Sequence, residues 1–440
     1  MATSIDDTGL WTPLPLFRRR RRFWVSLVAI ALVALIVRVL YAALWGWHLT
    51  NAFNDVFFYR GVAHSLAQGM GFQNTYLINP SAHPPMFPIV LSLTYFAKLS
   101  TYGEQLIFVA VIETVTVVVV GLVGAQIQGE RVGLLAAAIG AIYPGFWLPG
   151  SQVMSEPLAM LVVAVLTAVT YAFVRRPTTI RAVGIGVLCA LAALTRSELI
   201  LLVPLVAWPI IWFRRTIATP TRLRMIAIAT VAALFVVTPW TAFISAVHRK
   251  PELLSTQMGA TLAWSNCMYT YSGPLVGYWS GACIAPAYGQ PFPGNAALTS
   301  QAESYAFSHI SGWPFVIFAR EGRVWGFYRP AQQAQLNHNN DHWNLGVAQA
   351  ETWCLYLVIA FGVVGTVALR RRRVPLSPLL GVVLLVVITV GLFYGDPRFR
   401  ASSEVALVLL AAVGLDTVAA AAVGALSTKA TRTTDPTPAA

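Results

Sequence analysis

The sequence predicts an all-α polytopic membrane protein, and composition and charge placement are the two observations behind this fold class. Of its 440 residues, 57% are hydrophobic and 11% are charged, whereas soluble domains carry about 25% charged residues. A water-soluble fold could not cover this much apolar surface, so lipid must be the solvent for much of it. The length therefore fits a bundle of about ten membrane-spanning helices with connecting loops.

The net charge of +13 raises the question of nucleic-acid binding. The arginines, however, gather at the ends of apolar runs, which is the footprint of the positive-inside rule and not of a DNA-binding face. We therefore expect no nucleic-acid partner. The clusters are Arg18 to Arg22, then Arg175, Arg176 and Arg181, then Arg214, Arg215, Arg222 and Arg224, and finally Arg370 to Arg373.

Eleven apolar runs divide the chain. They lie at 23–47, 86–101, 105–127, 131–149, 153–174, 181–196, 199–213, 225–247, 352–369, 376–394 and 402–424. The first is too long for the apolar core of a signal peptide and predicts an uncleaved span. The run 86–101 is short, carries Lys98 and follows Pro84-Pro85. If it lies in the interface, every arginine cluster and both termini fall on the cytoplasmic side, so we predict interfacial helices there. Whether the short pair at 181–213 spans fully stays open.

This topology predicts five regions in a protein of the plasma membrane. They are a basic cytoplasmic N-terminus at 1–22, a transmembrane module at 23–247, a large external loop at 248–351, C-terminal membrane helices at 352–424, and a disordered cytoplasmic tail at 425–440. The transmembrane module contains a first external loop at 48–102. All seven histidines fall in the two external loops. Because loops on a rigid scaffold carry function, we expect the chemistry on the external face.

The first external loop offers a carboxylate just beyond the first span. We expect Asp55 to be partly desolvated at the membrane boundary, which would raise its pKa and suit it as a general base for an acceptor hydroxyl. The alternative is a solvated or helix-capping aspartate.

The pattern around Asp55 resembles a known family. Asp55 is followed by Tyr59 four residues on, then by the A-x-x-L-x-x-G-x-G-F stretch at 63–72 and by His83-Pro84-Pro85-Met86-Phe87-Pro88. This order is similar to that of the GT-C superfamily of membrane glycosyltransferases, in the branch of the protein O-mannosyltransferases and the lipid A aminoarabinose transferase. The likeness covers residues 24–245. It implies that Asp55 is catalytic and that Tyr59 and His83 line the substrate cavity.

Three further residues follow from the same likeness. Ser155-Glu156-Pro157 suits a helix N-terminus, yet the family carries an "SE" element here, which implies that Glu156 faces Asp55 and positions an acceptor or binds a metal. Arg196 and Glu198 form a "TR-x-E" stretch and are either a local ion pair or part of the substrate cavity.

Tyr394-Gly395-Asp396-Pro397-Arg398-Phe399-Arg400 precedes the last span. The family has an arginine motif here that contacts the donor lipid phosphate, which implies that Arg398 and Arg400 bind phosphate, as a guanidinium fork can. The alternative is interfacial snorkelling. The prolines that usually follow the motif are missing, and Ala401-Ser402-Ser403-Glu404 stands there. Arg60 is a second candidate for the phosphate.

The large loop contains two pairs of interest. Cys267 and Cys283 are candidates for a disulfide in an oxidising compartment. His338 and His342 could bind a metal if they were helical, but Asn339-Asn340-Asp341 between them favours a turn. No cofactor is required by the sequence, and a divalent metal stays an open alternative.

The resemblance implies an inverting glycosyltransferase. Its donor would be a sugar linked to polyprenyl phosphate, and its acceptor a glycan, lipid or protein on the extracytoplasmic face. One alternative is a transporter or lipid-linked sugar flippase, for which Arg38 and Glu113 are the main intramembrane charges. Another is an accessory subunit with a degenerate site.

Overall fold

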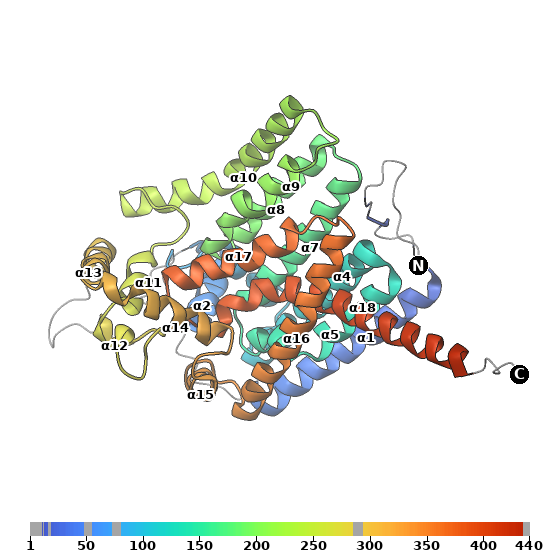
Figure 1. The fold of residues 1–440 in the computed structure, drawn as a ribbon. Helices are drawn as coiled ribbons and strands as arrows, with labels where there is room; N and C mark the ends of the chain where they lie inside the picture. The colour runs from blue at the N-terminus through green and yellow to red at the C-terminus, as the bar shows by residue number, and fades with distance from the viewer. Residues whose placement is uncertain are drawn as a thin grey trace, which may run out of the picture.

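The computed structural model describes residues 11, 13–15, 19–47, 55–72, 81–284 and 294–433. In this part of the chain the only regular elements are helices, which contain 79% of residues, and there is no strand (Figure 1). The helices are α1 (Arg21–Tyr41), α2 (Asp55–Ala67), α3 (Met86–Phe96), α4 (Tyr102–Gln128), α5 (Glu130–Ile142), α6 (Pro144–Trp147), α7 (Glu156–Arg175), α8 (Thr179–Ala193), α9 (Trp208–Trp212), α10 (Thr219–His248), α11 (Met258–Ser265), α12 (Met268–Tyr271), α13 (Asn295–Ser308), α14 (Trp313–Val324), α15 (Pro330–Asp341), α16 (Leu345–Arg371), α17 (Ser377–Leu392) and α18 (Ala401–Thr433).

Six helices of the described residues are long and apolar enough to cross a membrane. They are α1 with its continuation to Gly46, α4, α7, α10, α16, and α18 with the turn that precedes it. A seventh span results if α5 and the segment Pro144–Gly150, which are bent by 77°, cross together. The protein is thus an all-helical membrane protein. The count of about ten stays a prediction, because it also requires the shorter helices α8, Ser197–Trp212 and α17 to cross.

The run that was predicted to lie in the interface forms a short helix. Helix α3 has 11 residues, which corresponds to about 16 Å and is too short for a hydrocarbon core of about 30 Å. It packs against α2. In the chain, both helices come between the spans α1 and α4.

Two glycines let α16 and α18 pack in close contact. A Cβ atom on Gly365 of α16 would overlap the carbonyl oxygen of Leu410, and one on Gly414 of α18 would overlap that of Phe361. Small residues at such crossings allow membrane helices to approach each other closely. This packing fixes α18, and with it the turn Pro397–Arg400 that leads into α18.

The intramembrane charges Arg38 and Glu113 pair with each other. Arg38 Nε lies 3.1 Å from Glu113 Oε2, and the same guanidinium donates to the carbonyl oxygens of Ala34, Gly140 and Ala141. A buried charge needs a partner of this kind. The pair therefore joins α1, α4 and α5.

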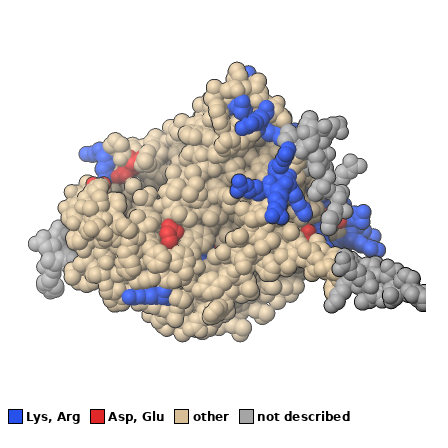
Figure 2. All heavy atoms as spheres, in the orientation of Figure 1, with Lys and Arg blue, Asp and Glu red and all other residues tan. Residues whose placement is uncertain are grey.

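Most exposed lysines and arginines gather toward one end of the molecule, at the upper right of Figure 2. The ends of α7, α9 and α16 bring the predicted clusters around Arg176, Arg215 and Arg371 to this end. Helices α11 to α15 of the large loop lie at the other end (Figure 1). The prediction of a disordered tail at 425–440 is wrong in part, because α18 continues as a helix to Thr433.

The large loop is fastened by a disulfide and two buried arginines. Cys267 and Cys283 are joined, with their Cα atoms 5.7 Å apart. From α14, Arg320 donates to Gly391 and Leu392 at the end of α17 and to the carbonyl oxygen of Ser265. Arg323 donates to the carbonyl oxygens of Val276 and Pro274. These bonds hold the loop over the ends of the membrane helices.

Candidate active site

A cavity of about 430 Å³ lies where the first external loop, the large loop and the end of α17 meet. One part of its wall is polar and includes Asp55, Tyr59, His83, Ser155, Arg196, Glu198, Asp396 and Arg398. Another part is apolar and includes Ile200, Leu201, Leu253, Leu254, Met258, Leu392 and Phe393. Three residues of the apolar part, Leu253, Met258 and Leu392, are also strongly exposed. Leu253 follows α10, Met258 begins α11 and Leu392 ends α17. Because these three residues both line the cavity and are exposed, the cavity has an apolar mouth and a charged interior.

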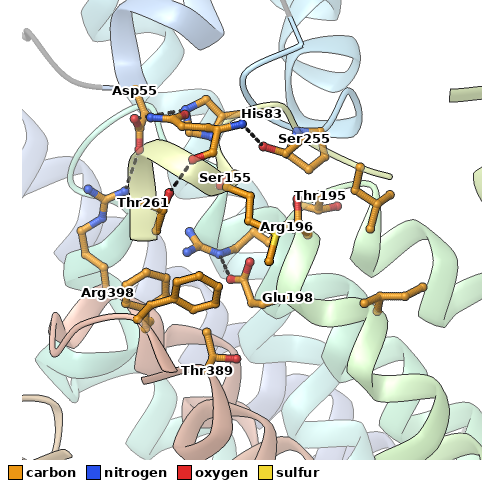
Figure 3. Close-up of a pocket in the computed structure, with 18 of the residues that line it drawn as sticks. Asp55, His83, Ser155, Thr195, Arg196, Glu198, Ser255, Thr261, Thr389 and Arg398 are labelled. Carbon is orange, nitrogen blue, oxygen red and sulfur yellow. Dashed lines mark hydrogen bonds and ion pairs between the residues drawn. The ribbon is translucent and has the colours of Figure 1, made fainter. Parts of the chain in front are cut away.

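Asp55 is the first residue of α2, where the positive end of the helix dipole favours a carboxylate. Its Oδ1 lies 3.2 Å from His83 Nε2, and its Oδ2 accepts from Arg398 Nη2 at 3.2 Å (Figure 3). The expectation of a raised pKa is wrong. Loss of water does act to raise it, but the attraction and hydrogen bonds of His83 and Arg398 outweigh this and hold the pKa of Asp55 well below its usual range.

The rings around His83 fix its position. It packs edge-on against Phe58, with centroids 4.9 Å apart, and lies 5.3 Å from the ring of Tyr59. The Tyr59 hydroxyl donates to Ser155 Oγ at 3.1 Å, and burial, followed by the charge of Asp55, raises the pKa of Tyr59. The predicted cavity residues Tyr59 and His83 therefore both lie in the wall beside Asp55.

Arg398 lies in the short 3₁₀ turn Pro397–Arg400. Asp396 caps this turn, since its Oδ1 accepts from the Arg398 backbone N–H at 3.0 Å. The guanidinium is bonded to three carboxylates. Nε and Nη2 lie 3.1 and 3.0 Å from Glu156 Oε1, Nη1 lies 3.2 Å from Asp341 Oδ1, and Nη2 reaches Asp55.

Glu156 links the two arginines of the site. It is the first residue of α7, completely buried, and its Oε1 also accepts from Arg196 Nη1 at 2.6 Å. Arg196 in turn donates from Nε to Glu198 Oε1 at 2.6 Å (Figure 3). A local ion pair and a place in the cavity were the two alternatives for Arg196 and Glu198. They do not exclude each other, because the ion pair forms part of the cavity wall.

Asp341 also reaches the site, although the sequence suggested it only as a possible partner of His338 and His342 in a metal site. It is the last residue of α15, it is 3% exposed, and its Oδ2 is buried with no hydrogen-bond partner among the described residues. Burial, reinforced by the charge of Asp396, raises the pKa of Asp341 despite the opposing charge of Arg398. The available signal was its place in the chain, since it lies a few residues before the apolar helix α16.

Two of the three arginines predicted to bind phosphate lie away from the cavity. Arg400 is buried against Glu351 and Glu404, with Nε 2.5 Å from Glu404 Oε1. Arg60 donates to Gln105 Oε1 at 2.7 Å and to the carbonyl oxygen of Ser100. Of the three, only Arg398 lines the cavity.

The histidine pair of the large loop has other partners. Helix α15 continues through the Asn-Asn-Asp stretch, so the expected turn is wrong up to Asp341. His338 Nδ1 bonds to the carbonyl oxygen of Trp343, and His342 ends the helix with a positive φ. Within the described ranges, no group of three or more His, Cys, Asp or Glu side chains is arranged to hold a metal ion. We therefore derive no step through a metal.

Comparison with known proteins gives a likeness in structure only. No family model and no curated protein sequence matches the chain. A crystal structure of the Archaeoglobus fulgidus oligosaccharyltransferase, tethered to an acceptor peptide containing the NVT sequon, matches with a TM-score of 0.53 and 14% identity over 91% of this chain and 50% of the other. The same enzyme, AglB, with an inhibitory peptide and a dolichol-phosphate matches with a TM-score of 0.51 and 14% identity over 90% and 50%.

A third structure belongs to ArnT from Cupriavidus metallidurans bound to undecaprenyl phosphate, with a TM-score of 0.44 and 15% identity over 91% of this chain and 78% of that one. AglB and ArnT are both GT-C proteins. The likeness to the two oligosaccharyltransferase structures, together with the apolar helices, shows a membrane protein with the GT-C fold, which confirms the predicted resemblance at the level of the fold. It spans about half the length of the archaeal oligosaccharyltransferase.

Proposed function

We propose that this protein is a GT-C glycosyltransferase that moves a sugar from a polyprenyl-phosphate-linked donor to an acceptor hydroxyl on the extracytoplasmic face of the membrane. The observation that carries the proposal is the contact between Asp55 and Arg398 in the wall of the cavity. It places a carboxylate that can accept a proton beside a guanidinium that can bind a phosphate. The apolar mouth fits the polyprenyl chain. The dolichol-phosphate and undecaprenyl phosphate in the AglB and ArnT structures support a donor of this class.

The reaction is a single displacement. Asp55 takes the proton of the acceptor hydroxyl, and the oxygen forms a bond to the anomeric carbon of the sugar. The bond from that carbon to the phosphate oxygen breaks on the opposite side, and its electron pair stays on the polyprenyl phosphate. The configuration of the carbon is therefore inverted. Arg398 stabilises the negative charge that develops on the leaving phosphate.

The carboxylates behind Arg398 serve to orient it. Glu156 accepts from Arg398 and also from Arg196, so it fixes both guanidinium groups at the base of the cavity. Arg196 and Glu198 then remain available in the wall to contact the sugar or the acceptor.

The test is a transfer assay in liposomes with synthetic polyprenyl-phosphate sugars. We expect wild type to transfer sugar, and Asp55→Asn and Arg398→Ala each to lose at least about 10²-fold in rate. Glu303→Gln, which neutralises an exposed carboxylate on α13, serves as the control and should match wild type. Equal rates in all four proteins would reject the proposal. Movement of labelled lipid across the bilayer without sugar transfer would favour the flippase alternative.

A further inference from the structure

The hydrogen-bonding capacity of Arg398 is almost used up by carboxylates. A guanidinium has five N–H donors. Glu156 Oε1 occupies the edge formed by Nε and Nη2, at 3.1 and 3.0 Å. Asp341 and Asp55 share the edge formed by Nη1 and Nη2, each at 3.2 Å. A phosphate that binds two parallel N–H groups therefore has no edge available until a carboxylate moves.

Of the three carboxylates, Asp55 is the one placed to move. Its side chain is 31% exposed, whereas those of Glu156 and Asp341 are 1% and 4% exposed. Asp55 lies in the cavity wall, where the donor would arrive, and His83 remains as its second partner after Arg398 is lost. Glu156 and Asp341 sit behind the guanidinium and would keep hold of it.

We propose that Asp55 and the donor phosphate bind Arg398 in alternation, while Glu156 and Asp341 act as positioning residues that hold the guanidinium during the exchange. This proposal rests on the proposed glycosyltransferase function and adds an order of events to it. Without donor, Asp55 is bound to Arg398 and is a weak base. The arriving phosphate takes the Asp55 side of the guanidinium and frees the carboxylate to accept the proton of the acceptor.

The exchange keeps the negative charge that faces the guanidinium the same before and after donor binding. In the unliganded protein the guanidinium faces the carboxylate of Asp55, and after donor binding it faces a phosphodiester with the same single negative charge. When transfer is complete, Asp55 carries the proton and is neutral, so it no longer competes with the polyprenyl phosphate product. The freed base is thus produced only where a donor is already in place, which favours binding of the donor before the acceptor.

The test compares the affinity of purified variants for a short-chain polyprenyl monophosphate in nanodiscs. Asp55→Asn removes the competitor of the phosphate and should bind the probe about fivefold more tightly than wild type, although it cannot transfer sugar. Glu252→Gln is the matched control. It removes a carboxylate next to the cavity residue Leu253 in the chain, but one that is paired with Lys250 and does not line the cavity, so its affinity should stay within about twofold of wild type. Asp341→Asn should bind the probe more weakly, since Arg398 then loses one of its supports.

Three results would overturn the exchange. One is equal or weaker binding by Asp55→Asn, and another is the same tightening in Glu252→Gln, which would indicate general charge repulsion. Asp55→Ala provides a second variant in case Asp55→Asn does not elute as a single folded species. The third is the absence of probe binding in wild type, which would remove the proposed function as well. Binding by wild type with no gain in Asp55→Asn would remove only the exchange.

Discussion

Arg398 Nη2 donates to Asp55 Oδ2 at 3.2 Å, although the two residues are 343 positions apart in the chain. One belongs to the turn before the last membrane helix and the other to the first helix of the first external loop. The contact therefore joins an early and a late segment of the chain in the wall of the cavity.

The low pKa of Asp55 leads to a prediction about pH. The active form of this base is ionised, so a lowered pKa keeps it active at pH values below the usual range of an aspartate. His83→Ala removes one of the groups that lower the pKa, so the acidic limb of kcat/KM for the donor should move to higher pH. Activity should fall more at pH 5 than at pH 7.5.

The measurement is the profile of kcat/KM from pH 4 to 8, which reports on the free enzyme. Glu303→Gln should keep the wild-type profile. A reduction of the His83→Ala rate by one constant factor at every pH would show that His83 has only a structural role.

Arg398 and Arg60 should respond differently to substitution. Arg398→Lys keeps the charge but replaces a planar fork that contacts three carboxylates with a single ammonium. We expect it to lose about 10²-fold or more in transfer rate. Arg60→Ala removes bonds outside the cavity and should keep at least about half of the activity. Comparable losses in the two variants would mean that Arg60 also contacts the substrate.

Arg400 should matter for stability more than for chemistry. It is buried and bonded to Glu351 on α16 and to Glu404 on α18. Arg400→Met leaves two buried carboxylates without their partner, so it should lower the free energy of unfolding by about 3 kcal/mol or more. Thermal unfolding in detergent checks this. The triple variant Arg400→Met, Glu351→Gln, Glu404→Leu should recover part of the loss, and no recovery would contradict the ion-pair explanation.

The close contact of α16 and α18 can be tested with alanine. Gly414→Ala places a Cβ against the carbonyl oxygen of Phe361, so it should destabilise the protein by about 1–3 kcal/mol. Gly424→Ala in the same helix is the control, because a Cβ there would meet no atom of the described residues within 4 Å. It should leave stability unchanged or raise it slightly. The shift in melting temperature from wild type measures the effect of each substitution. Equal shifts in the two variants would exclude packing as the cause.

The predicted sidedness of the membrane is open to labelling. We expect Glu303→Cys in the large loop to react with a membrane-impermeant maleimide from the outside of intact cells. Arg372→Cys at the end of α16 should react only after the membrane is permeabilised. Reaction of both from outside would contradict the topology, and the native cysteines give the background in unsubstituted protein.

Composition and local residue patterns were enough to predict the class of the protein and most residues of its site. The composition indicated that lipid is the solvent for much of the surface. Apolar runs of helix length that end in arginines predicted a helical bundle with one basic end. A carboxylate at the start of α2, another at the start of α7 and an arginine before α18 were visible as polar residues that interrupt or border apolar runs. Each of these is a local property of the chain.

The contacts among these residues, in contrast, follow from the folded arrangement of the helices. Arg398 and Arg400 look equivalent in sequence, but they are two positions apart in a 3₁₀ turn of three residues per turn, so they point to different sides. One faces the cavity, and the other enters the core between α16 and α18. Asp341 reaches Arg398 because α15 runs on as a helix through a stretch of turn formers. Direction and proximity depend on how distant helices pack, and no local pattern of residues encodes that.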